Sequence, residues 1–206
     1  MVFANKWAVP ITIITAENPN CQELSRQENN FLNDKLEQHL CAGGYLYKKI
    51  KGFYGVEEDG KLPEHSFVIA GMKLSVVKKL AKNFEQQSFI YIDKTQNDVN
   101  PYRFYAIDKN TGEYVNVDSK NYIKYVPLET DFYSQAKDYK GNIPFTKFKV
   151  EDVDKAITSV NECLNKLTDK EYEMYVEGLN LNNSNMCGRY YYQKRVQATA
   201  RLLQKQ

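Results

Sequence analysis

The first half of the chain alternates between short apolar runs and amphipathic segments. Four runs rich in β-branched or aromatic residues predict strands over residues 9–15, 45–53, 66–70 and 88–92. The first of them, VPITIIT, is followed by Asn18-Pro19-Asn20, a combination that is typical of turns. Each run is too short for an ordinary helix, so we expect four strands that are largely buried.

Two helices are predicted between these strands. Ser25 and Glu28 match the S-x-x-E capping box, in which two residues satisfy each other's free amide groups at a helix start. Leucines then recur at helical spacing until Gly43-Gly44 ends the segment. The second helix is indicated by the spacing of Leu74, Val77, Leu80, Ala81 and Phe84. The element order of residues 9–92 is therefore βαββαβ.

This order is typical of α+β proteins with a ferredoxin-like core. In that fold, right-handed crossovers place the strands in the order four, one, three, two, with both helices on one face of the sheet. A doubly wound parallel sheet is the alternative, because a sequence pattern does not reveal strand direction. The link between the second and third strands, residues 55–63, is charged and has no helical pattern. Such a link favours an antiparallel hairpin, so we predict the ferredoxin-like arrangement.

The pattern changes from Pro101 onward, and we divide the chain into a core over residues 1–95 and an extension over 96–206. Residues 103–107 and 113–117 flank a Gly-containing loop, which predicts a β-hairpin. The extension continues with a predicted strand over 121–126 and an irregular Tyr-rich stretch over 129–149. Helices are predicted over 153–167, 168–177 and 185–204, and the second of them begins with the capping-box pair Thr168 and Glu171. We expect this hairpin or meander and the C-terminal helices to pack on the core.

Composition and charge narrow the class of protein. The 206 residues are 42% hydrophobic and 26% charged, which predicts a folded chain rather than a disordered one. The formal net charge of +2 excludes a grossly basic or acidic tail but leaves room for a local patch. No apolar stretch approaches the length of a membrane span, and residues 1–16 are too interrupted by polar residues for a signal peptide. We expect a cytoplasmic protein that does not insert into a membrane.

Metal and cofactor signatures are missing from the sequence. The four cysteines are scattered without a CxxC pair, so we expect reduced structural thiols rather than disulfides or metal ligands. There are two histidines, and no HExxH, GxxxxGK[ST], GxGxxG or GxSxG run occurs. We therefore expect no metal and no cofactor.

Four short motifs resemble a bacterial family described as domain of unknown function 3293. The family pattern runs ITAxNP, SxxEN, ExS before an apolar strand, and FGQ before the last strand. This chain has residues 14–19 (ITAENP), 25–29 (SRQEN), 64–66 (EHS) and 84–86 (FEQ) in the same order. The resemblance covers residues 11–92 and implies no activity. Glu85 stands where the family has Gly, so we expect a different local geometry here if that Gly serves a turn with positive φ.

The predicted topology brings these motifs to one edge of the sheet. This edge would hold the polar residues Asn18, Ser25, Asn29, Glu64, Ser66 and Gln86. A helix N-terminus at the same place supplies free amide donors and partial positive charge, which suits an anionic or amide-bearing ligand. Local roles are the alternative. Ser25 would form a reciprocal cap with Glu28, Asn18 a turn and Asn29 a tertiary hydrogen bond. Gln86 would cap the C-terminus of the second helix, and Glu64 would be either an anchor for loops or a general base. Glu64 and Ser66 alternate away from His65, so these three cannot form a relay within the strand.

The C-terminal segment carries a second candidate site. No acidic residue follows Glu177, and at helical spacing Tyr190, Lys194, Arg201 and Lys205 gather on one face. Basic side chains beside an exposed tyrosine suit a phosphate backbone and a stacked base. A solvated helix face is the alternative.

We predict a small binding protein that engages a nucleotide or nucleic acid. One alternative is a structural or interaction protein whose Tyr-rich second half binds a protein partner, since tyrosine is common at interfaces. The other is a small enzyme that acts on a nucleotide-like substrate with Glu64 as acid or base. The lack of an evident set of acid, base and nucleophile counts against the enzyme.

Overall fold

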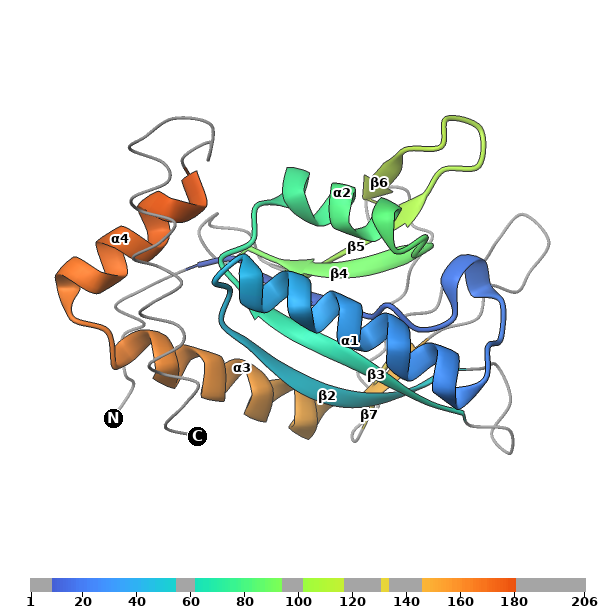
Figure 1. The fold of residues 1–206 in the computed structure, drawn as a ribbon, viewed down its shortest axis with the longest axis horizontal. Helices are drawn as coiled ribbons and strands as arrows, with labels where there is room; N and C mark the ends of the chain where they lie inside the picture. Colours follow the sequence, from blue (N-terminus) through green and yellow to red (C-terminus); the bar gives the residue numbers. More distant parts are fainter. Residues whose placement is uncertain (1–8, 55–61, 94–101, 117–130, 134–145, 181–206) are drawn as a thin grey trace.

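A computed structural model gives the structure of the protein and describes residues 9–54, 62–93, 102–116, 131–133 and 146–180. Within these ranges the chain is α+β, with one eight-stranded antiparallel sheet in the order β6-β5-β4-β1-β3-β2-β8-β7 (Figure 1). The strands are β1 (Ile11–Ile14), β2 (Tyr47–Tyr54), β3 (Leu62–Ala70), β4 (Ser88–Ile92), β5 (Tyr102–Ile107), β6 (Tyr114–Asn116), β7 (Asp131–Tyr133) and β8 (Thr146–Lys149). The helices are α1 (Arg26–Ala42), α2 (Leu74–Asn83), α3 (Val150–Asn165) and α4 (Asp169–Asn180), with a 3-10 turn η1 (Pro19–Cys21).

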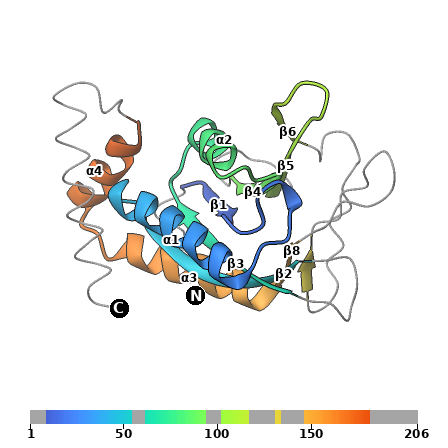
Figure 2. The same ribbon diagram turned by 45° about the vertical axis from the view of Figure 1, so that its right-hand side comes forward.

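The centre of the sheet has the strand order β4-β1-β3-β2, with β2 antiparallel to β3, as the sequence predicts. Figure 1 and Figure 2 show α1 and α2 on the same face of these strands. Leu36 and Leu40 of α1 share one core cluster with Val77 and Leu80 of α2. The predicted position of both early helices on one face is therefore observed.

The opposite face of the sheet is covered by α3, whose residues Val160 and Leu164 pack in a second cluster with Ile13 and Val68. The next helix, α4, is joined to the sheet by Tyr175, which is 0% exposed. Its hydroxyl donates to the carbonyl oxygen of Ala70 at 3.0 Å and accepts from the Leu46 amide at 3.2 Å. These bonds satisfy backbone groups at the ends of β2 and β3.

Elements of the second half extend the same sheet at both edges. The predicted hairpin forms as β5 and β6 beside β4. Our expectation that 129–149 is irregular is wrong in two places, because β7 and β8 pair there and β8 also pairs with β2. The predicted strand 121–126 and helix 185–204 lie outside the described residues. Among the described helices, none is long and apolar enough to cross a membrane.

Candidate functional site

The loop that follows β1 is held by side chains from α1. Asn33 accepts a hydrogen bond from the Ala16 amide at 3.1 Å, and Asn29 accepts one from the Asn18 amide at 2.9 Å. Thr15 donates through its hydroxyl to the carbonyl oxygen of His65 at 2.7 Å. The loop is therefore fixed to α1 on one side and to β3 on the other.

Asn18 and Asn29 lie together, as the polar edge predicted, and satisfy each other. The Asn18 side-chain oxygen accepts from Asn29 Nδ2 at 2.9 Å and from the Leu24 amide at 3.2 Å. Asn18 has a φ of 50°, a left-handed conformation that asparagine tolerates better than most residues. Both side chains are buried, so their amides hold the loop and the start of α1 in place.

Gln86, which lies between α2 and β4, belongs to the same polar group. Its Nε2 donates to the carbonyl oxygens of Glu17 at 3.0 Å and Phe84 at 3.1 Å. Its own backbone carbonyl accepts a hydrogen bond from the Tyr114 hydroxyl. Gln86 is 5% exposed and connects the loop after β1 to the turn between α2 and β4.

Ser25 caps α1 as predicted. Its hydroxyl accepts from the Glu28 amide at 3.3 Å, and the Glu28 carboxylate accepts from the Ser25 amide at 2.9 Å. Hydrogen bonds from the Ser25 side chain and backbone lower the pKa of Glu28, because they favour its ionised form. The start of α1 is thus satisfied within the chain.

Glu64 and Ser66 are not brought into this group. Successive strand residues face opposite sides of a sheet, and the even-numbered β3 residues Val68 and Ala70 belong to the α3-side cluster. Glu64 and Ser66, each 2% exposed, share that side, whereas Asn18 and Asn29 lie on the α1 side. The single edge cluster predicted from the sequence is therefore divided by the sheet, although all its members lie near one end of it.

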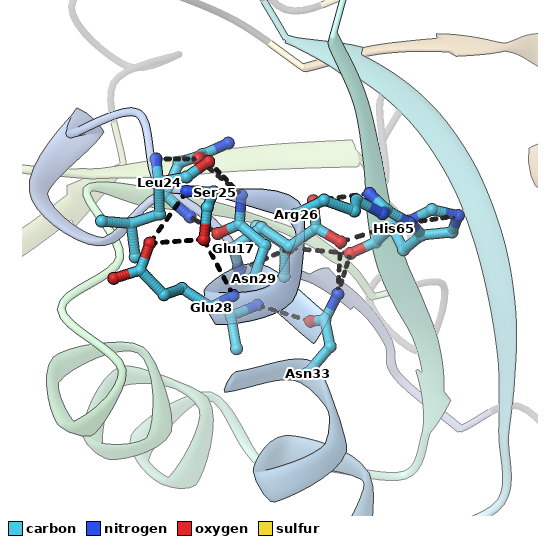
Figure 3. A network of polar contacts seen from close by, with 11 residues as sticks. Glu17, Leu24, Ser25, Arg26, Glu28, Asn29, Asn33 and His65 are labelled. Atoms are coloured by element: carbon cyan, nitrogen blue, oxygen red, sulfur yellow. Dashed lines mark hydrogen bonds and ion pairs between the residues drawn. The ribbon is translucent and has the colours of Figure 1, made fainter. Parts of the chain in front are cut away.

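A buried carboxylate, Glu17, is the centre of the site on the α1 side (Figure 3). Glu17 is 1% exposed, and its Oε1 accepts from Asn33 Nδ2 at 2.7 Å and lies 3.2 Å from His65 Nδ1. Its Oε2 has no hydrogen-bond partner among the described residues and lies 3.6 Å from Arg26 Nη1. A buried carboxylate is costly unless cations offset its desolvation, and Arg26 supplies such a charge, to which His65 adds a second when it is protonated.

Two basic side chains, Arg26 and His65, flank Glu17, and a third, Lys51, lies on the neighbouring strand. Arg26 begins α1, His65 lies on β3, and Lys51 of β2 is the direct cross-strand partner of His65. Cross-strand partners share a face of the sheet, so Lys51 is on the α1 side and is exposed. The side chains of Arg26 and His65 are 48% and 34% exposed. We call Arg26, Lys51 and His65 the basic edge.

Sequence reasoning missed Glu17, Arg26, Lys51 and His65 as site residues. Glu17 lies inside the ITAENP motif, where an acidic residue directly after a buried strand signals a carboxylate held close to the core. The alternation that separates His65 from Glu64 and Ser66 was predicted, and it is this alternation that turns His65 towards α1. Combining those two observations points to the Glu17–His65 pair.

Glu85 corrects the expectation of a different local geometry. Its φ is 52°, so the turn between α2 and β4 keeps the left-handed conformation that a glycine would adopt. The Glu85 carbonyl accepts from the Asn20 amide at 2.8 Å, and Gln87 Nε2 donates to the Asn20 side-chain oxygen at 3.0 Å. These contacts fasten η1 to the turn.

The second predicted site, comprising Tyr190, Lys194, Arg201 and Lys205, lies outside the described residues. Within the part of the chain that the structure describes, no group of three or more His, Cys, Asp or Glu side chains is arranged to hold a metal ion.

Residues 14–89 match the family model described as Protein of unknown function (DUF3293), which confirms the resemblance over that segment. No curated protein and no solved structure matches the chain.

Proposed function

We propose that the protein binds a phosphate-bearing ligand of the nucleotide class, either a free nucleotide or a nucleic acid, at the basic edge. The observation that carries the proposal is that Arg26 and His65 flank one buried carboxylate, while Lys51, from a third element, is the cross-strand partner of His65 on the same face of the sheet. With His65 neutral, the edge has two cations against one carboxylate, and protonation of His65 adds a third positive charge. An excess of positive charge favours an anion.

The chemistry of the three side chains fits a phosphate. The guanidinium of Arg26 presents a planar set of donors that matches two phosphate oxygens, and Lys51 adds a point charge. Glu17 holds Arg26 and His65 in place before any ligand arrives, which lowers the entropy lost on binding. Both side chains remain partly exposed and are therefore accessible to a ligand.

Asn18, Asn29 and Gln86 serve this proposal as supports rather than as ligand contacts. Their amides are used by the loop between β1 and α1, so a ligand would have to break existing bonds to reach them. Glu64 as acid or base is not supported, because it lies on the α3 side of the sheet. For the fold, we propose that β1–β4 with α1 and α2 form a ferredoxin-like unit, which the strand order and antiparallel pairing support.

Fluorescence anisotropy with a labelled nucleoside triphosphate and a labelled single-stranded oligonucleotide tests the proposal. Arg26→Ala and Lys51→Ala should each weaken binding, whereas Lys79→Ala, which removes an exposed lysine from α2, should not. For a single strand, two cationic contacts predict a slope of about −1.4 in log affinity against log salt. The two probes distinguish a free nucleotide from a nucleic acid.

Arg26→Ala leaves Glu17 with less compensating charge and can lower stability, so its thermal unfolding is measured alongside. Lys51→Ala does not remove a charge that compensates Glu17, so a loss of binding in this variant reports on ligand contact and not on stability. Binding of neither probe at low salt, or equal losses in Lys51→Ala and Lys79→Ala, would overturn the proposal.

A further inference from the structure

We propose that His65 is the general base of an RNA-cleaving reaction and that Glu17 is its positioning carboxylate. The inference rests on the proposed function, because the phosphate that reacts is the one that the basic edge binds. The substrate class is single-stranded RNA, cleaved by the 2′-hydroxyl next to the bound phosphate.

Glu17 and His65 are held in a fixed geometry by Asn33. Asn33 holds Oε1 of Glu17 at 2.7 Å, and the same oxygen lies 3.2 Å from His65 Nδ1. Asn33 also donates to the backbone carbonyl of His65 at 3.1 Å, so one side chain aligns both members of the pair. A carboxylate beside Nδ1 favours the tautomer with its proton there, which leaves Nε2 free to accept a proton.

Arg26 also contacts the imidazole of His65. Its Nη2 contacts Nδ1 and lies 3.2 Å from Nε2. A ring nitrogen has either a proton or a lone pair, so Nδ1 cannot donate to Glu17 and accept from Arg26 at once. A phosphate that takes the hydrogen bond of Arg26 Nη2, while Nη1 stays beside Glu17, removes this conflict. Ligand binding then leaves Nδ1–H facing Glu17 and Nε2 beside the phosphate.

The nucleophile comes from the substrate and not from a side chain of the protein. The hydroxyl of Ser25 donates to the Glu28 carboxylate at 2.6 Å, and that of Thr15 donates to the His65 carbonyl. Neither hydroxyl is therefore aimed at a ligand on the basic edge. A ribose 2′-hydroxyl lies next to its own 3′-phosphate, and attack within one molecule gains a large effective concentration.

The proposed reaction transfers the phosphate from the 5′-oxygen to the 2′-oxygen. The 2′-oxygen forms a bond to phosphorus while the bond from phosphorus to the 5′-oxygen breaks. The 2′-hydroxyl proton passes to His65 Nε2, and the departing 5′-oxygen takes a proton from water. The hydroxide that remains then takes the proton from His65 Nε2, which restores the neutral base. Arg26 and Lys51 stabilise the negative charge that develops on the phosphate oxygens. The products are a 2′,3′-cyclic phosphate and a 5′-hydroxyl end.

The experiment compares an end-labelled single-stranded RNA with a DNA of the same sequence. DNA lacks the nucleophile, so anisotropy with DNA reports binding alone, whereas gel analysis of the RNA reports cleavage. The wild-type protein should bind both and cleave the RNA, and one deoxynucleotide at the cleaved position should block cleavage there. His65→Gln should lose about 10²–10⁴-fold in rate, far more than it loses in DNA binding, because Arg26 and Lys51 still hold the phosphate.

Two further variants separate the roles. His39→Gln replaces an exposed histidine on α1 outside the basic edge and, purified in the same way, should cleave at the wild-type rate. Glu17→Gln should slow cleavage per folded molecule while DNA binding stays near the wild-type level, because Glu17 acts through the orientation of His65. A purely structural role for Glu17 would lower the folded fraction, and cleavage and DNA binding would fall together.

DNA binding without RNA cleavage would overturn this inference and leave the proposed function standing. Absence of both would overturn the two together. Cleavage that persists in His65→Gln would overturn the role of His65. If Glu17→Gln does not fold, the comparison of His65→Gln with His39→Gln still decides the inference.

Discussion

The carboxylate of Glu85 accepts a hydrogen bond from the side-chain amide of Asn20, although 65 residues separate the two along the chain. The backbone of Glu85 accepts a second bond from Asn20 and has a φ of 52°. An L-residue in this conformation is strained, and the strain persists because the bonds to η1 hold the turn. Glu85 thus gives the chain a contact that a glycine could not make.

Replacing Glu85 by glycine and by alanine distinguishes the effect of its backbone strain from the effect of its side-chain hydrogen bond to Asn20. Glu85→Gly relieves about 1 kcal/mol of backbone strain and loses one exposed hydrogen bond of about the same worth, so stability should stay nearly unchanged. Glu85→Ala keeps the strain and loses the bond, so it should be less stable than Glu85→Gly by about 1 kcal/mol. Urea unfolding measures both, and equal midpoints for the two variants would contradict this account.

Asn33 is predicted to be a strong determinant of stability near the site. It is 8% exposed and bonds to the Ala16 amide, the Glu17 carboxylate and the His65 carbonyl. Asn33→Ala leaves the Ala16 amide without its acceptor and removes one of the contacts to the Glu17 carboxylate and to the His65 carbonyl, so it should cost about 2–4 kcal/mol of unfolding free energy. Asp34→Ala changes the exposed neighbouring residue and should stay within about 0.5 kcal/mol of wild type. Similar losses in both variants would show that Asn33 is not the anchor described above.

Local patterns predicted the elements near the site well. The capping boxes at Ser25 and Thr168 form as expected, because each is made by residues three apart in sequence. The strand over 88–92 has the predicted bounds, since its apolar run is flanked by polar residues. The antiparallel pairing of β2 with β3 followed from the link that joins them.

The rest depended on contacts between distant residues. β8 forms where no strand was expected because it pairs with β2, and its own four residues give little indication of a strand. Glu17 reads as one more polar residue in a turn, and its burial appears only when Asn33, Arg26 and His65 close over it. Glu64 and Ser66 were expected at the right end of the sheet, but strand ends alone do not reveal that Asn18 and Asn29 lie on the opposite face.

Tyr175 is expected to secure α4 to the sheet through its hydroxyl. Tyr175→Phe keeps the ring but removes the donor to Ala70 and the acceptor for the Leu46 amide. Both backbone groups are buried, so the unfolding free energy should fall by about 1–3 kcal/mol. Hydrogen exchange at the Leu46 amide should become faster than in wild type. Unchanged exchange there would show that another group protects this amide.

The buried tyrosines of β4 and β6 predict a loss of stability at alkaline pH. Burial, with a smaller contribution from Asp93, raises the pKa of Tyr91 to about 12, and burial raises the pKa of Tyr114 to about 12, against an ordinary value of 10.0. Between these values the unfolded chain loses protons that the folded chain keeps. The free energy of unfolding should therefore be constant below pH 10 with respect to these groups and fall as the pH rises towards 12.

Phenylalanine variants test this alkaline transition because they remove the titrating hydroxyl and keep the ring. Tyr114→Phe should cost about 1 kcal/mol at neutral pH, since the Gln86 carbonyl loses its donor, but its stability should fall less steeply above pH 10. Tyr91→Phe should also flatten the curve, and the double variant should flatten it more than either single change. Urea unfolding at a series of alkaline pH values gives the slopes. If all four proteins lose stability equally steeply, other groups cause the transition.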